Sequence, residues 1–195
     1  MSQKRGERRQ QILETLAGML QDPSGEKITT AALAARLEVS EAALYRHFAS
    51  KAQMYEGLIE FIETTLLGLL ARISADSGGG VRQVEIAVPA LLRFAVTNPG
   101  MTRVLIGDAL VHEHERLQTR INQLHDRLEA QIRQSLRFAV AEGQLPAHRD
   151  VSAQANAIMA FVTGKWHQYA KSRFKRNPLD GLEIQTSLLL GGPTT

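Results

Sequence analysis

Residues 29–51, with the sequence TTAALAARLEVSEAALYRHFASK, carry the clearest structural pattern of this chain. Thr29 or Thr30 can cap a short helix whose apolar residues share one face. Ser40 can cap a second short helix that mixes small, apolar and polar side chains. Two short helices joined by a tight turn are typical of a helix-turn-helix, which places its second helix in the major groove of duplex DNA.

The side chains of the second helix predict how it meets DNA. Small residues let its backbone approach base edges, and polar residues can reach phosphates. We expect the residues in the major groove to be Ser40, Glu41, Ala42, Ala43, Tyr45, Arg46 and His47. We expect the phosphates to be held by Thr29, Thr30, Tyr45, Arg46 and Lys51. By spacing alone, the same stretch also fits two ordinary short helices of an α-helical domain.

The distribution of charge favours the DNA-binding interpretation. The segment before the motif carries one acid, Glu7, against Lys4, Arg5, Arg8 and Arg9. The motif region carries two acids, Glu38 and Glu41, against Lys27, Arg36, Arg46 and Lys51. Because the formal net charge of the whole chain is only +3, this basic character is local and predicts binding through one face. A basic amino-terminal arm adds nonspecific DNA affinity, although such a run alone is also typical of a solvated tail.

Composition and periodicity predict an all-α fold. The 195 residues contain no cysteine, which excludes a disulfide framework and a cysteine-zinc site. No signal peptide and no apolar run of membrane-spanning length occurs, so we expect a cytoplasmic protein with no membrane contact. His112 and His114 are two residues apart and point in different directions on a helix, so we expect no metal site there. We also expect no cofactor and no enzymatic activity, since the sequence contains neither a nucleophile elbow nor a phosphate-binding loop.

Helical periodicity and helix breakers divide the chain into a head and a body. We expect a three-helix DNA-binding head over residues 1–51 and a helical dimerisation and partner-binding bundle over residues 52–195. The predicted helices span residues 8–20, 51–75, 81–96, a short stretch after 98–100, 115–142, 151–176 and 179–190. The apolar repeat in 115–142 fits either a helix lying along a bundle, which we favour, or a coiled coil.

Residues 151–176 also bear on the oligomeric state. Their apolar positions occupy more than one narrow stripe, which indicates burial on two sides. Since helix-turn-helix proteins usually bind paired half-sites as two-fold dimers, we expect a homodimer on palindromic DNA. A helix fully buried in the core of a monomer is the alternative.

Several segments carry a family resemblance. VSEAALYRHF followed by SK resembles the DNA-binding domain of the tetracycline-repressor family. Three further stretches are similar to the nucleoid-occlusion branch of that superfamily: LIEFIE at 58–63, NPGMTRVLIGDAL at 98–110 and ERLQTRINQLHDRLEAQIRQSLR at 115–137. The family commonly has Gly in the turn where this chain has Glu38, and a positive φ there costs a non-Gly residue about 1 kcal/mol.

The resemblance implies a nucleoid-associated factor that binds chromosomal DNA and inhibits a tubulin-like division protein. It places the partner surface at Phe61, Ile62 and Asn98, although Phe61 also fits a core position. Leu69 and Thr97 stand where the family has basic residues, and the substitutes we expect are Arg72, Arg93 and Arg103. A groove with an apolar anchor and nearby positive charge suits an acidic, hydrophobic tail. The alternative function is a ligand-responsive repressor, with an apolar pocket built from residues 81–166.

Overall fold

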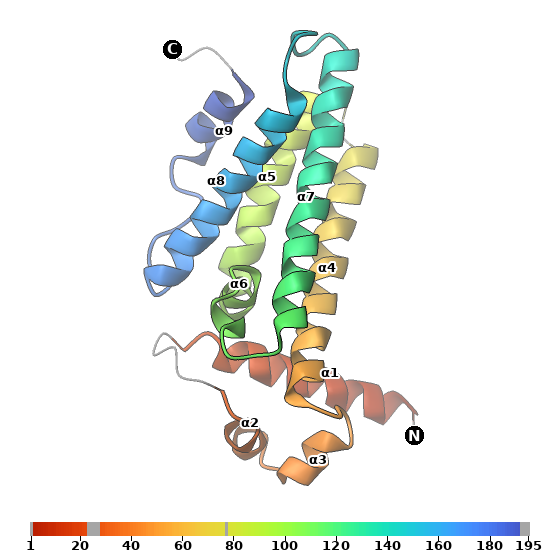
Figure 1. Ribbon diagram of the computed structural model, residues 1–195, viewed down its shortest axis with the longest axis vertical. Coiled ribbons are helices and arrows are strands. Elements are labelled where there is room, and N and C mark those ends of the chain that lie inside the picture. Colours follow the sequence, from red (N-terminus) through yellow and green to blue (C-terminus); the bar gives the residue numbers. More distant parts are fainter. Residues whose placement is uncertain (1, 23–27, 77, 192–195) are drawn as a thin grey trace. The chain divides into compact units, whose positions relative to one another are not determined.

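The computed structural model describes residues 2–22, 28–76 and 78–191, with side chains from residue 6 onward, and every regular element in these ranges is a helix (Figure 1). The all-α prediction is therefore confirmed. The helices are α1 (Ser2–Met19), α2 (Thr30–Arg36), α3 (Glu41–Tyr45), α4 (Lys51–Asp76), α5 (Gly80–Thr97), α6 (Pro99–Leu105), the 3₁₀ turn η1 (Asp108–Leu110), α7 (Glu115–Ala141), α8 (Val151–Lys171) and α9 (Leu182–Leu190). No helix in the described ranges is both long and apolar enough to cross a bilayer.

Local capping rules account for the predicted helix starts. Thr29 Oγ1 accepts a hydrogen bond from the Ala32 N–H at 3.1 Å, and Ser40 Oγ accepts one from the Ala43 N–H at 3.3 Å. Each bond satisfies a donor that has no partner inside the first turn of the helix. Both predicted caps are confirmed, with Thr29 rather than Thr30 as the cap of α2.

The predicted end of the penultimate helix is wrong. Helix α8 ends at Lys171 rather than residue 176, because Arg173 and Phe174 take left-handed conformations with φ of 57° and 60°. The Phe174 N–H then donates to the Tyr169 carbonyl at 2.9 Å, which closes the helix end. Neither Gly nor Asn stands at residues 172–174, so the residue types that usually adopt a left-handed conformation at a helix end are absent.

Contacts group the chain into two compact units. The first comprises Met1–Ile62 and Asn98–Ile121, and the second comprises Glu63–Thr97 and Asn122–Thr195. Helices α4 and α7 contribute residues to both units. The predicted domain border between residues 51 and 52 stays a prediction. It concerns which parts of the chain fold independently, and contacts within one structure do not test that.

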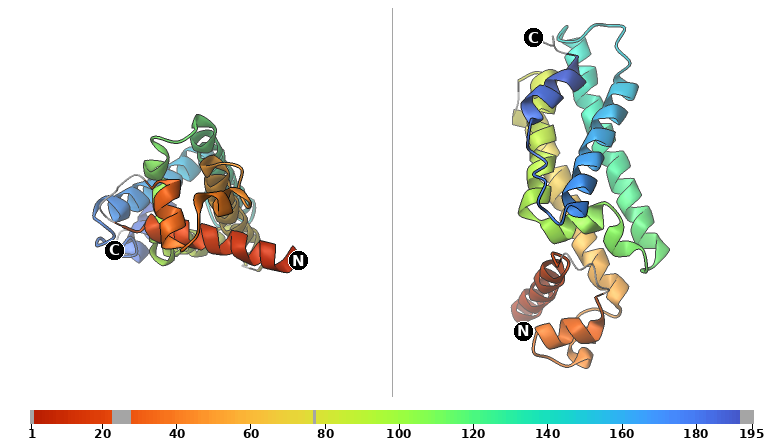
Figure 2. Two further views of the ribbon diagram at one scale, coloured as in Figure 1. Left: turned by 90° about the horizontal axis from the view of Figure 1, so that it is seen from below. Right: turned by 90° about the vertical axis from the view of Figure 1, so that its left-hand side faces the viewer.

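In the first unit, α1 packs against both α2 and α6, and α2 packs against α3 (Figure 2). The helices bury an apolar core that includes Leu16, Leu33, Leu44, Phe48 and Leu58, each at most 1% exposed. Burying one such side chain contributes roughly 1.5–3 kcal/mol, so this core holds the short helices α2 and α3 in place.

The second unit is a helical bundle in which α5 packs against α8 and α9 (Figures 1 and 2). Trp166 of α8 is fully buried, and its indole N–H donates to the Leu91 carbonyl of α5 at 3.2 Å. The apolar repeat of α7 within this unit is buried by the chain's own helices, at Leu124, Leu128, Ile132 and Leu136. This burial confirms the bundle interpretation of residues 115–142 over a coiled coil.

Candidate nucleic-acid interface

The turn between α2 and α3 has the geometry that the sequence suggested. Glu38 has a φ of 55°, so it occupies the left-handed region where the family commonly has Gly. The Val39 N–H donates to the Ala34 carbonyl at 3.0 Å, and the Glu38 N–H donates to the Ala35 carbonyl at 3.1 Å. This Schellman arrangement satisfies the last carbonyls of α2 and offsets part of the cost at Glu38. The turn thereby fixes the direction in which α3 leaves α2.

One side-chain bond joins the two helices of the motif directly. Thr30 Oγ1 donates to the Glu41 carboxylate at 2.6 Å. The DNA contacts of both residues stay predictions, and in the structure this bond links α2 to the first turn of α3. Thr29 and Ser40 accept from backbone N–H groups, so each keeps its own hydroxyl hydrogen to donate to a phosphate.

The outer face of α3 carries most of the residues predicted to enter the groove. Ala42, Tyr45 and Arg46 are exposed, and Tyr45 reaches 47%. Ala43 is half-buried, while Leu44 on the opposite face is buried. The helix thus presents small and polar side chains outward, which lets its backbone approach base edges closely.

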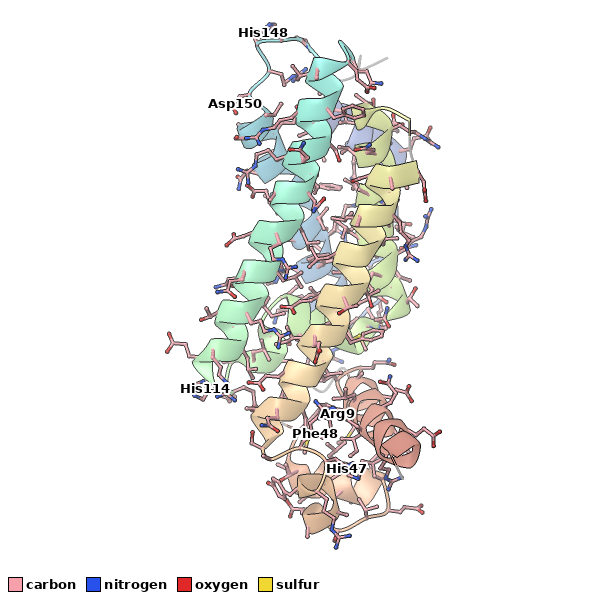
Figure 3. The ribbon with its side chains drawn as sticks, turned by 90° about the vertical axis from the view of Figure 1, so that its right-hand side faces the viewer. Arg9, His47, Phe48, His114, His148 and Asp150 are labelled. Carbon is pink, nitrogen blue, oxygen red and sulfur yellow. The ribbon has the colours of Figure 1, made fainter. Side chains whose placement is uncertain are left out.

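Arg9 makes two contacts within the predicted DNA-binding head. Its guanidinium carbon lies 4.3 Å from the centre of the Phe48 ring, and its Nη1 donates to the His47 carbonyl at 3.4 Å (Figure 3). His47 itself is half-buried. A cation–π contact and a hydrogen bond at the same place tie α1 to the chain that follows α3. Of the other predicted basic residues, Lys27 and the side chains of Lys4 and Arg5 lie outside the part of the chain that is described.

Lys51, predicted to hold a phosphate, is paired with an acid. Its ammonium group donates to the Glu113 carboxylate, and the two side chains are 19% and 11% exposed. The Lys51 Nζ also lies 5.6 Å from the centre of the Tyr55 ring. Burial, and secondarily the charge of Glu113, raises the pKa of the Tyr55 phenol above its ordinary value. The pairing with Glu113 was not predicted, because no local sequence pattern connects residues 62 positions apart.

The residues predicted for the division partner differ in accessibility. Phe61 is 42% exposed, which favours a binding role over the core alternative, whereas Ile62 is fully buried and can only support α4 from inside. Arg72 and Arg93 are exposed. Asn98 is half-buried, and its carbonyl accepts from the Thr102 N–H at 3.0 Å.

Arg103, expected as a substitute cation, is engaged within the first unit. Its Nε donates to Asp108 at 2.8 Å, and its Nη1 donates to the Leu20 and Asp22 carbonyls at 3.3 and 3.4 Å. With its side chain only 13% exposed, it serves the packing of α6 against the end of α1.

The bundle of the second unit contains a small hollow. The centre of a water-sized sphere can occupy only about 10 Å³ of it, and its walls include the polar residues Ser74, Gln83 and Ser135. Pockets for drug-sized ligands are typically about 300–1,000 Å³. This hollow therefore falls short of the size that a ligand-responsive repressor needs.

The capped helix pair, the fixed turn and the exposed face of α3 define a helix-turn-helix DNA-binding protein. Comparison with protein families agrees with this class. The family described as "Bacterial regulatory proteins, tetR family" matches residues 12–58, and the SlmA-like family described as "Tetracyclin repressor-like, C-terminal domain" matches residues 80–191.

Curated relatives make the assignment more specific. Nucleoid occlusion factor SlmA of Marinomonas sp. (strain MWYL1) is 47% identical over 180 residues, covering 92% of this chain and 91% of the relative. The factor of the same name from Idiomarina loihiensis is 43% identical over 189 residues, covering 97% and 96%. The chain belongs to the tetracycline-repressor family and, within it, to the nucleoid occlusion factors.

Solved structures share the fold at low sequence identity. The TetR family transcriptional regulator PfmR from Thermus thermophilus has a TM-score of 0.77 at 20% identity, covering 94% of this chain and 99% of the other. The MbdR regulator from Azoarcus sp. CIB has a TM-score of 0.79 at 17% identity, covering 94% and 97%. These two neighbours support the helical head-and-bundle architecture.

Proposed function

We propose that the protein binds palindromic duplex DNA as a symmetric homodimer and, when bound to the chromosome, inhibits assembly of the tubulin-like division protein. Septum formation over the nucleoid is then blocked. The outward face of α3, with Ala42, Tyr45 and Arg46 exposed, is the observation that carries the DNA-binding part. The similarity to nucleoid occlusion factors over 92% and 97% of the chain supports the division role.

Helices α8 and α9 offer a face for the second copy. The apolar residues that suggested two-sided burial of α8 lie largely within the chain's own core, for example Ile158, Val162 and Trp166. The outer face of α8 instead carries small residues at helical spacing, namely Ala153, Ala157, Ala160 and Gly164. Helix α9 packs on α8 and exposes two large apolar side chains one turn apart, Ile184 at 71% and Leu188 at 51%. Small residues allow close helix approach and large ones supply apolar area, a combination that suits self-association.

A charged side chain on this face tests the dimer. No atom outside the helix's own backbone and chain neighbours lies within 4 Å of a Cβ placed at Gly164, so the first carbon of the Gly164→Arg side chain has room in the isolated chain. In a two-fold dimer, however, it places two cations close together in a desolvated contact. We expect the wild type to have the mass of a dimer by light scattering and to select palindromic duplexes. The variant should dissociate at least about tenfold more readily, because like-charge contacts cost several kcal/mol. Single, unpaired half-sites selected by the wild type would contradict the symmetric dimer.

Phe61 is the anchor we propose for the division protein's acidic carboxy-terminal tail. Arg72 lies eleven residues further along α4, close to three turns, so both project from the same face of that helix. An exposed aromatic anchor with a cation on the same face fits a tail that is both hydrophobic and acidic.

The tail interaction can be measured by fluorescence anisotropy with a labelled tail peptide, with and without the selected DNA site. We expect Phe61→Ala to weaken tail binding roughly tenfold, since aromatic anchors are frequent hot spots. Phe138, at the same 42% exposure on α7, provides the matched control, and Phe138→Ala should leave tail binding unchanged. If the wild type binds no tail in either condition, the protein is a transcriptional regulator without the division role.

A further inference from the structure

The pairing of Lys51 with Glu113 gives the acid a role in DNA recognition. Lys51 opens α4 directly after the helix-turn-helix, and Glu113 lies in the connection between η1 and α7. We propose that Glu113 competes with a DNA phosphate for the Lys51 ammonium group and thereby lowers the affinity of the head for DNA. This inference rests on the proposed DNA-binding function.

Within the described part of the chain, Glu113 has one cationic partner, because the two nearby arginines pair with other acids. Arg103 pairs with Asp108 at 2.8 Å, and Arg116 pairs with Glu56 at 2.8 Å. Among the described residues, Lys51 is the only cation within 4.0 Å of the Glu113 carboxylate. A Lys51 that moves to a phosphate therefore leaves behind a carboxylate whose side chain is only 11% exposed.

That unpaired carboxylate opposes the transfer of Lys51 from Glu113 to a DNA phosphate. Removing one partner of a poorly solvated ion pair costs more than the pair itself contributes, because the remaining charge is incompletely solvated. The phosphate must offset this cost before Lys51 adds to the affinity. A negative charge at Glu113 also repels the approaching phosphates directly. Both effects act in the same direction, so the wild-type protein binds DNA more weakly than a variant without this acid.

The local structure keeps Glu113 in place. Its N–H donates to the Leu110 carbonyl at 2.9 Å, which fixes the connection after η1. On the other side, Arg116 holds the first turn of α7 to Glu56 of α4, and Arg120 donates to the Glu56 carbonyl at 3.4 Å. A backbone hydrogen bond before α7 and two arginine contacts within α7 therefore hold Glu113 beside the start of α4.

A double-mutant cycle tests the competition. DNA affinity of full-length wild type, Glu113→Gln, Lys51→Ala and the double variant is measured against salt on the selected duplex and on a random-sequence duplex. We expect Glu113→Gln to bind about threefold to tenfold more tightly, with a salt slope steeper by up to about 0.9 per protomer, because the freed Lys51 neutralises one further phosphate. In the Lys51→Ala background, the same substitution should have a much smaller effect.

A charge-matched control separates competition from net charge. Glu85→Gln removes an acid that pairs with Arg82 on α5, and it should leave DNA affinity nearly unchanged. Unchanged or weaker binding by Glu113→Gln, or equal tightening with and without Lys51, would overturn the inference while DNA binding itself stands. Absence of DNA binding by the wild type would instead reject the proposed function. Should Glu113→Gln fail to fold, Lys51→Ala is compared with Arg46→Ala. A loss of DNA affinity in Lys51→Ala as large as the loss in Arg46→Ala contradicts the competition.

Discussion

The Ala42→Asp variant is expected to lose at least about 100-fold in affinity for its DNA site while keeping its fold. Ala42 is exposed on the outer face of α3, where we place the base edges of the major groove. A carboxylate there meets phosphates and base acceptors without compensating donors, and such juxtapositions cost several kcal/mol. The same carboxylate lies in the first turn of α3, where a negative charge stabilises a helix. Loss of DNA binding is therefore not a consequence of unfolding.

Two controls isolate the position and the charge. Ala42→Ser adds a polar group of similar size without charge, and we expect it to retain most of the affinity. Ala130→Asp adds the same charge at an exposed position on α7, and it should change affinity only slightly. Electrophoretic mobility shift at several salt concentrations measures all three variants, and thermal unfolding verifies their folds. Near-wild-type binding by Ala42→Asp would show that α3 does not lie in the major groove.

Features that depend on neighbours in sequence were the predictable ones. Caps at Thr29 and Ser40 and the start of α4 at Lys51 follow from residues within one helical turn. The positive φ at Glu38 also followed from local information, once the position was matched to a family turn that commonly holds Gly. The left-handed end of α8 at Arg173 and Phe174 was not predictable, since neither residue type favours that conformation.

Features that depend on distant residues required the structure. Arg9 and Lys51 are both basic residues next to the motif, and both were predicted to contact DNA. The structure places Arg9 on the Phe48 ring and Lys51 on Glu113. A basic side chain at a fold-determining motif therefore has two possible uses, and only the position of an aromatic ring or an acid from elsewhere in the chain distinguishes them.

Two adjacent residues of the predicted partner surface, Phe61 and Ile62, differ in burial because they lie on different faces of α4. Ile62 falls in step with Leu58 and Leu66, which are buried at three- or four-residue spacing, and it joins their face. Phe61 is rotated by about 100° from Ile62 and remains exposed. This distinction was available from the sequence, because the apolar phase of α4 could have been applied to each residue separately.

Among the Gly→Ala substitutions in the first unit, Gly100→Ala is expected to destabilise the protein most. Gly100 lies in the first turn of α6, where that helix packs on α1. A Cβ at this position would lie 2.0 Å from the Ala17 carbonyl oxygen, a backbone atom that cannot rotate away. Overpacking of this kind costs typically 1–3 kcal/mol and occasionally more, and a backbone clash belongs at the upper end.

Gly18, an exposed glycine next to Ala17 on α1, supplies the matched control. A Cβ at Gly18 on α1 would meet nothing within 4 Å, and Ala is the better helix former by up to about 1 kcal/mol. For a chain of this size 1 kcal/mol corresponds to roughly 2–4 °C in Tm, so Gly100→Ala should melt about 6–12 °C below the wild type and Gly18→Ala slightly above it. Equal melting temperatures for Gly100→Ala and the wild type would mean that α1 and α6 separate at little cost. In that case the support that α6 gives to α1, and through Arg9 to the end of α3, would be weak, and substitutions in α6 should leave DNA affinity unchanged.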